Sequence, residues 1–503
     1  MTVTTRLTSR YLAEYTRQRV NLALLVLVPL IFVVLASGTI TDFAEIVGFA
    51  GDPSRLAAPT AGWAAAFLAG VAGLFQVLGS RDADRRLAIA GMSPARITAA
   101  RLGSGLALAL LAAAASIVAL ALRVGISDPL RTIVGTVMFA VIYLGIGVAV
   151  GALVRTDVNG SLIVIFIWMF DVFLGPAMAG SDIWITRLFP SHYVTLVTLD
   201  AASGHGGPIG DLGWALLWTF GALGVAATVF SVSTATRKVG RTTRPARPGW
   251  GRLRAGLRFG MRDYRRNIAM WVLLVALPIL FISLSFYITP EAPTPVDLTE
   301  NGVTAVTFLS MVDVHGAIMV PITIAFLAGL AGLFVVQGSL EADARLAIAG
   351  FRTREILASR LGTILVAALL TTAVSLGVTA IDFTPESWEW FAVGSVLVAV
   401  TYGMIGVLVG AVFGRLGGLY VMFLLPFIDV GIAQNIMFSA SPPSWGVVLP
   451  GRGAVQILVN GAFTTTFDQL AMLILAVLWI AGLAIVTATV FRRIAEPKGL
   501  RIG

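Results

Sequence analysis

The chain has 503 residues, of which 57% are hydrophobic and only 12% are charged, and it contains no cysteine. Soluble domains carry about 25% charged residues, so this composition excludes an ordinary soluble enzyme and indicates an integral membrane protein. Disulfides and thiolate metal sites are excluded as well. The formal net charge of +9 does not indicate nucleic-acid binding, because the basic residues cluster beside apolar segments and therefore report membrane topology.

Apolar runs of spanning length recur along the whole chain. A bilayer core of about 30 Å needs about 20 apolar residues in a helix, and we predict an all-α membrane protein with twelve spans, six in each half. The first half holds them at about 20–40, 59–80, 102–122, 132–154, 160–180 and 211–234. The second half holds them at about 268–288, 311–338, 361–381, 389–413, 417–438 and 467–490.

The basic residues predict the orientation of these spans. Loops on one side hold about 30 Arg and Lys residues and loops on the other side about five, so the richer side should be cytoplasmic. We therefore expect a multi-pass protein of the cell membrane with both termini in the cytoplasm. Because six is an even number, the two halves would insert in the same orientation as parallel repeats.

A basic segment at 235–266 separates the halves. It is rich in Arg, Pro and Gly, and from Trp250 it can form an amphipathic helix on the inner leaflet. The N-terminal RYLAEYTRQRVN looks like its counterpart, so each repeat would begin with an interfacial helix. The expected organisation is a first repeat at 1–234, a linker with the second interfacial helix at 235–266, and a second repeat at 267–503.

One passage occurs twice, at 69–103 and at 328–362. About 22 of its 35 positions are identical at a constant offset of 259, and such fixed-period similarity marks a repeated architecture. Both copies share acidic and basic positions and a Leu-Ala-Ile-Ala-Gly motif. The residues that we single out as a candidate docking surface are Asp82, Asp84, Arg86, Leu87, Ile89 and Gly91 in the first copy, and Glu341, Asp343, Arg345, Leu346, Ile348 and Gly350 in the second.

The passage predicts a short cytoplasmic helix, a turn, and a helix that re-enters the membrane. Gly91 suits a helix C-terminus, and Ser93-Pro94 suits the start of the next helix. The loop could simply be solvated, with charges that anchor the ends of two spans. The retained apolar motif instead favours burial against a partner.

The order of an interfacial helix, two spans, a charged loop of RLAIAG-x-S-P-x-x-I type and four spans resembles an ABC type-2 exporter permease, here with two units fused in one chain. The resemblance implies that the loops dock on a separate ATP-binding subunit, in two copies. It also implies export of an amphipathic or hydrophobic, drug- or antibiotic-like compound. The chain has no Gly-x-x-x-x-Gly-Lys-Ser/Thr motif, so we expect no enzyme activity and no cofactor in this chain, with ATP and Mg on the partner.

Polar residues interrupt the fifth span of each half, Asp171 in the first and Asp429 in the second. A carboxylate at membrane depth costs about 2.5–3.5 kcal/mol and therefore normally faces a cavity or a partner group. Gln434 and Asn435 extend the polar track in the second half. These four residues could line a translocation path for a cationic substrate or for protons, or the acids could form hydrogen bonds between helices.

Two other classes of protein share part of this pattern. A proton-coupled secondary transporter of the major facilitator type also has twelve spans in two parallel halves, and the segment from Gly79 to Arg86 imitates its loop motif with altered spacing. A membrane-embedded enzyme would need His and acidic groups at one depth, but His192, His205 and His315 are all expected near the outer side.

Overall fold

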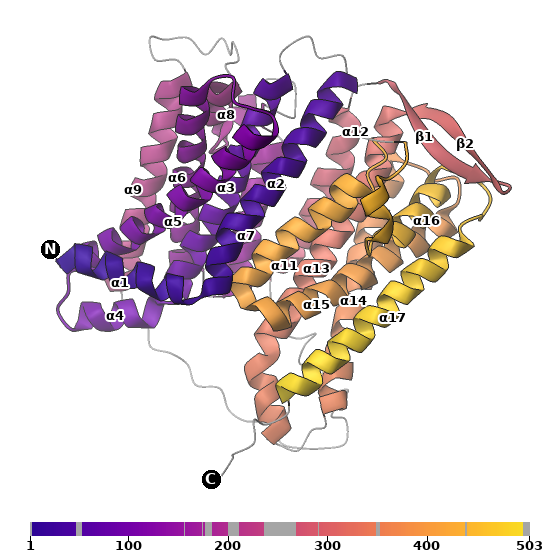
Figure 1. The fold of residues 1–503 in the computed structure, drawn as a ribbon. Helices are drawn as coiled ribbons and strands as arrows, with labels where there is room; N and C mark the ends of the chain where they lie inside the picture. The colour runs from indigo at the N-terminus through magenta and orange to yellow at the C-terminus, as the bar shows by residue number, and fades with distance from the viewer. Residues whose placement is uncertain are drawn as a thin grey trace. The chain divides into compact units, whose positions relative to one another are not determined.

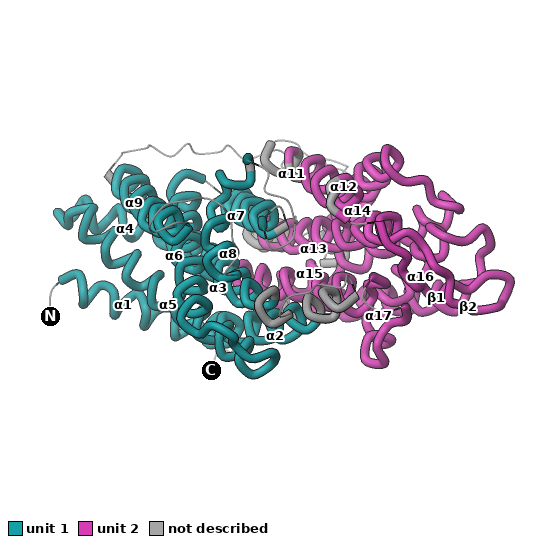
Figure 2. Tube along the Cα trace, turned by 90° about the horizontal axis from the view of Figure 1, so that it is seen from above, with its two compact units in different colours: residues 1–244 teal, residues 245–503 magenta. Residues whose placement is uncertain are grey.

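The structure is a computed structural model, and it describes residues 3–46, 53–154, 156–173, 175–176, 184–199, 211–235, 268–289, 291–348, 353–437 and 440–495. The chain separates into two compact units, Met1–Arg244 and Pro245–Gly503, which have different colours in Figure 2. The described residues are mainly helical, as the sequence predicts.

Unit 1 contains long apolar helices and several short ones (Figure 1). The long helices are α2 (Arg19–Ile46), α3 (Pro53–Leu78), α5 (Pro94–Arg123), α6 (Pro129–Leu153), α7 (Asp157–Phe173) and α9 (Asp211–Ala235). The short ones are α1 (Val3–Arg17), α4 (Arg81–Ile89), the 3₁₀ turn η1 (Trp184–Leu188) and α8 (His192–Leu199). Figure 1 shows α1 and α4 together at one end of the unit and α8 at the other end.

Unit 2 contains helices and a two-stranded hairpin. Its elements are α11 (Ile268–Pro278), the π-helical turn η2 (Ile279–Ser283), α12 (Leu284–Ile288), strands β1 (Pro293–Glu300) and β2 (Val303–Ser310), α13 (Met311–Ile348), α14 (Thr353–Asp382), α15 (Trp388–Pro426), the π-helical turn η3 (Phe427–Ala433), the 3₁₀ turn η4 (Ser444–Val448), α16 (Arg452–Phe463) and α17 (Leu470–Ala495).

Glycines let two helices come into direct backbone contact in each unit. A Cβ atom on Gly147 of α6 would overlap the carbonyl oxygen of Gly70 on α3. A Cβ atom on Gly406 of α15 would overlap the carbonyl oxygen of Gly329 on α13 in the same way. Small residues permit such close packing of apolar helices. The two contacts join the second and fourth predicted spans of each half at the same offset of 259.

The hairpin of β1 and β2 is a feature that the twelve-span prediction did not include. The strands pair antiparallel from Pro293 with Ser310 to Glu300 with Val303. Asn301 and Gly302 connect them with φ angles of 52° and 76°, which is the geometry of a tight hairpin turn. The Asn-Gly pair was the sequence signal for this turn.

Nine helices in the described part of the chain are long and apolar enough to cross a membrane, which confirms a helical membrane protein. The prediction of twelve differs for local reasons. Helix α7 has only 17 residues, and the π-helical turn η2 interrupts the predicted span at 268–288 directly after Pro278. The two predicted spans after Trp388 follow each other without a loop and are separated by a kink at Gly414, whose φ of 70° and ψ of −162° are not helical.

Candidate functional site

The first copy of the duplicated passage follows the predicted order of helix, turn and helix. Helix α4 ends at Ile89, Gly91 takes a φ of 94°, and Pro94 occupies the first turn of α5. A positive φ suits glycine, and proline suits the first turn because its missing N–H has no partner there. The chain thus reverses direction within a few residues and presents α4 at one end of unit 1 (Figure 1).

Asp84 of this loop forms a buried ion pair with Arg101 of α5. The guanidinium Nε lies 2.9 Å from Asp84 Oδ2, and its second nitrogen lies 2.8 Å from Oδ1. The side chains of Asp84 and Arg101 are only 2% and 5% exposed. A paired, two-pronged contact of this kind is strong and geometrically specific. Asp84 is therefore buried and not on the loop surface, and a role for it in docking stays a prediction.

The same ion pair fixes the N-terminal helix α1. The hydroxyl of Tyr11 donates to Asp84 Oδ1 at 3.3 Å, and the Arg101 guanidinium lies over the Tyr11 ring at 3.5 Å from its centre. Burial raises the pKa of the Tyr11 phenol to about 12, against the opposing effect of the Arg101 charge. The acidic residue of the duplicated motif thus locks α1, α4 and α5 together.

The other predicted docking residues of the first copy divide by helical periodicity. Asp82, Arg86 and Ile89 are exposed and lie at spacings of four and three, so they share one face of α4. We call these three residues the α4 face. Ile89 is 80% exposed. Leu87 packs against the hydrophobic core of unit 1 from the opposite face, and Gly91 is exposed in the turn.

Arg81, at the start of α4, caps the end of a different helix. Its guanidinium donates to the carbonyl oxygens of Gly151, Ala152 and Val154, the last at 2.7 Å. These carbonyls end α6 and have no partner inside that helix. Burial, with the nearby Arg85 charge, lowers the pKa of Arg81. The second copy has Leu340 at this position, and the helical geometry of α15 is broken at Gly414, where φ is 70° and ψ is −162°.

The second copy of the passage is only partly described. Glu341, Asp343, Arg345, Leu346 and Ile348 belong to α13, which continues without a break to Ile348, but their side chains lie outside the described part. Gly350 lies outside the described residues altogether. The two copies therefore differ in backbone, because α4 is a separate helix in unit 1.

Asp171 is buried at the end of α7 and accepts hydrogen bonds from two other elements. The hydroxyl of Tyr143 on α6 donates to Oδ2 at 2.7 Å, and the backbone N–H of Ser191 reaches Oδ1 and Oδ2 at 3.1 and 3.0 Å. Asp171 is only 2% exposed. Ser191 directly precedes α8, so the carboxylate ties the start of this short helix to α6 and α7.

Unit 2 contains the same arrangement around Asp429, which is 3% exposed. The hydroxyl of Tyr402 on α15 donates to Oδ2 at 2.7 Å, and the N–H of Gly451 before α16 donates to Oδ2 at 2.6 Å. A Cβ on Gly451 would lie only 2.8 Å from Oδ2, so glycine allows the backbone to approach. We call each set of Tyr, Asp and backbone N–H a carboxylate latch.

The two remaining polar residues of the predicted track also make local contacts. The amide of Gln434 donates to the Gly446 carbonyl at 2.7 Å and reaches Asp429 Oδ1 at 3.4 Å. Asn435 donates to the Gly431 carbonyl at 3.2 Å. The bond from Gln434 to Gly446 fits the alternative of hydrogen bonds between elements of one unit, and a role of the four residues in translocation stays a prediction.

The latches contain residues that the sequence analysis did not select. Tyr143 and Tyr402 lie at the offset of 259, and Pro190 and Pro450 directly precede the two N–H donors. A Tyr, an Asp and a Pro at nearly the same spacing in both halves were the available signal, with offsets of 259, 258 and 260. The electrostatics are favourable, because the N-terminus of a helix carries partial positive charge and attracts a carboxylate.

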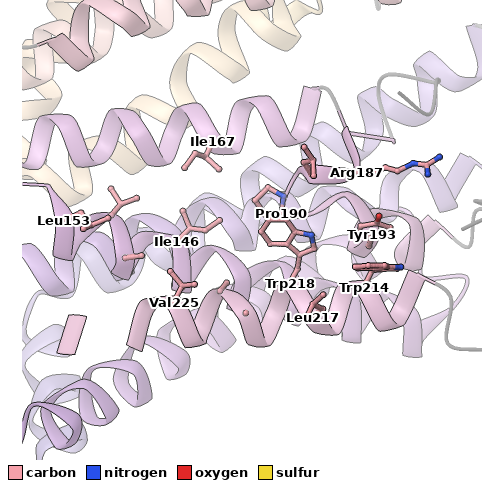
Figure 3. Close-up of a pocket in the computed structure, with 16 residues that line it drawn as sticks. Ile146, Leu153, Ile167, Arg187, Pro190, Tyr193, Trp214, Leu217, Trp218 and Val225 are labelled. Atoms are coloured by element: carbon pink, nitrogen blue, oxygen red, sulfur yellow. The ribbon is translucent and has the colours of Figure 1, made fainter. Parts of the chain in front are cut away.

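A cavity of about 730 Å³ lies beside the latch of unit 1, between α6, α7, α9 and the segment from η1 to α8 (Figure 3). Its walls are apolar along most of its length, with Ile146, Leu153 and Val225 among the lining residues. Arg187 carries the only charge among the sixteen residues that line it. Pro190, a neighbour of the latch donor Ser191, also lines the cavity.

Comparison with known proteins relates this part of the chain to a transporter family. Residues 63–232 match the family model described as ABC-2 family transporter protein. The matched range lies within unit 1 and includes α4, the latch of Asp171 and the cavity. No curated protein matches the chain.

Proposed function

We propose, starting from the membership of residues 63–232 in the ABC-2 transporter family, that this chain is the membrane permease of an ATP-driven exporter. It would move an amphipathic or hydrophobic compound, drug-like or antibiotic-like, out of the cell. The family match and the apolar helices support a permease. The match does not favour the proton-coupled carrier.

The observation that carries the proposal is the α4 face. Ile89 is a large apolar side chain, exposed on a short charged helix at one end of unit 1. The helix beneath it is braced by the Asp84–Arg101 pair and by the Arg81 cap. A rigid base under an exposed apolar residue with charged neighbours is what a docking surface needs, because little ordering is lost on binding.

The partner that docks here would be a separate ATP-binding subunit. The sequence has no phosphate-binding loop, and its only lysines are Lys238 and Lys498. ATP and Mg would therefore be held by the partner, and this chain would have no enzyme activity of its own. The duplicated passage supports two docking sites, hence two copies of the subunit and a fused pair of permease units. The docking side and both termini would face the cytoplasm.

Co-purification tests the proposal. The chain is produced together with a candidate ATP-binding subunit, and the complex is captured through the chain. Charge reversal at Arg86 and Arg345 together, or Ile89→Asp, should reduce the captured subunit and the ATPase activity. Arg131→Glu is a matched control, because Arg131 is an exposed arginine at the start of α6, away from α4.

Two outcomes would contradict the proposal. One is a complex that survives all changes on the α4 face while Arg131→Glu is equally harmless. The other is export that continues without ATP but stops when the proton gradient is dissipated, because that result would restore the secondary-carrier alternative. Membrane insertion, followed by fractionation, should be unchanged in every variant.

A further inference from the structure

The cavity of unit 1 is long and has two chemically different ends. Figure 3 shows Arg187, Tyr193 and Trp214 at one end and Leu153 at the other. Along α9 it extends from Trp214 to Val225, which corresponds to about 16 Å of helix. Tyr193 and Trp214 stack with their rings 5.7 Å apart. The site therefore offers a partly open apolar groove with an aromatic and cationic end.

The form of the cavity restricts its occupant. A polar molecule would lose its hydrogen bonds to water among the Ile, Leu and Val side chains and gain few in return. A hydrocarbon chain has no hydrogen bonds to lose there. At the aromatic and cationic end, the guanidinium of Arg187 points away from the apolar part, and such a group matches phosphate or carboxylate oxygens. Trp and Tyr rings are typical of the level of lipid head groups.

The corresponding helices of unit 2 pack differently at this point, as two residues show. Tyr193 and Gly453 both lie two positions after the backbone donor of their latch. In unit 2, a Cβ on Gly453 would lie 2.9 Å from the backbone nitrogen of Ala476, so α16 packs directly on α17. In unit 1, the stacked rings of Tyr193 and Trp214 lie between α8 and α9.

We propose that this cavity binds an anionic membrane lipid, with one acyl chain between α6 and α9 and the head group at Arg187. The volume of about 730 Å³ lies within the range of about 300–1,000 Å³ typical of small-molecule sites. The occupant would also contact Pro190 and Tyr193, which flank the latch donor Ser191. A bound lipid therefore braces the same segment that Asp171 holds.

Photo-crosslinking in lipid nanodiscs tests this site. The full chain is placed in nanodiscs that contain a photoreactive phosphatidylglycerol, and labelled peptides are identified by mass spectrometry. We expect labelling on residues 145–153 and 214–225 to exceed labelling on α17, which also exposes large apolar residues such as Leu470 and Leu478. A photoreactive phosphatidylcholine serves as the neutral probe.

Two glycines of α9 provide a matched pair of variants. A Cβ on Gly221 or on Gly224 meets nothing within 4 Å, but only Gly221 lines the cavity. Gly221→Leu should fill the cavity and reduce labelling there roughly tenfold, whereas Gly224→Leu should leave it unchanged. Arg187→Gln should reduce labelling by the anionic probe and spare labelling by the neutral one.

Several results would overturn the proposal. Labelling that is no stronger at the cavity than on α17 would show ordinary lipid contact. Equal labelling in Gly221→Leu and in the unchanged chain would place the lipid elsewhere. Displacement of the probe by an exported compound, but not by unlabelled phosphatidylglycerol, would make the cavity a substrate site. None of these results depends on ATP, so they are separable from a failure of the permease proposal.

Discussion

Removal of the carboxylate of Asp171 should release the segment from η1 to α8. In Asp171→Ala, the N–H of Ser191 loses the acceptor that it has at 3.0–3.1 Å. A buried donor without a partner costs about 1–3 kcal/mol. The hydroxyl of Tyr143 is partly compensated, because the Ile167 carbonyl lies 3.4 Å away. The expected cost is therefore dominated by the backbone donor.

Hydrogen exchange followed by mass spectrometry measures this cost locally. A loss of about 1–3 kcal/mol corresponds to amide exchange that is roughly 5- to 150-fold faster in residues 184–199. Residues 444–463, which the other latch holds, serve as a control within the same molecule. Asp429→Ala should give the reverse pattern. Its effect should be larger, because Tyr402 and Gly451 both donate to Asp429 at 2.6–2.7 Å.

The conservative variants separate packing from hydrogen bonding. Tyr143→Phe removes one hydroxyl and should cost about 1 kcal/mol, because the bond to Ser191 remains. Asp171→Asn keeps one oxygen acceptor and should have an intermediate effect. Unchanged exchange in residues 184–199 in Asp171→Ala would refute the latch as the contact that holds this segment. Export that is lost in Asp171→Asn while exchange stays normal would favour the translocation role.

Three further predictions concern other contacts. Gly147→Leu should prevent stable packing of α3 on α6, because any Cβ at this position would overlap the Gly70 carbonyl. The purified yield should fall relative to the control Gly338→Leu, where a Cβ meets nothing within 4 Å. Arg81→Ala should fray the end of α6 at a cost of about 1 kcal/mol, visible as faster exchange in residues 150–154. Attachment of α1 to Asp84 should be complete below about pH 10 and weaken as the pH approaches the Tyr11 pKa of about 12. A spin label at Ser9→Cys, which would be the single cysteine of the chain, should gain mobility in that pH range. Tyr11→Phe should abolish this transition.

Local sequence signals predicted local structure well. Gly91 and Pro94 marked the turn after α4 because each residue type satisfies a backbone requirement that few others meet. Asn301 and Gly302 carried an equally local signal for the hairpin. The span count differed because apolar length does not reveal where a helix is interrupted, as at η2, or where two helices meet at a kink without a loop, as at Gly414.

Contacts between distant segments could not be read in the same way. The partners in the ion pair and in the Tyr143 bond are separated by 17 and 28 positions, and Tyr11 lies 73 positions from Asp84. Only the fold brings them together. A charge in a loop therefore suggested a surface, whereas Asp84 is buried. A comparison of the two repeats could have indicated the contact between Tyr and Asp, because both latches use the same residue types.

Helix α6 connects α4 to the carboxylate latch of unit 1. One end is pinned to α4 by the Arg81 cap, and Tyr143 engages the latch from a position about 15 Å further along the same helix. A force on the α4 face must bend α6, break the Arg81 cap, or shift Tyr143 relative to Asp171. In unit 2 the second copy has leucine in place of Arg81. A force on that copy would therefore reach the latch of unit 2 through other contacts, and the two units need not move together.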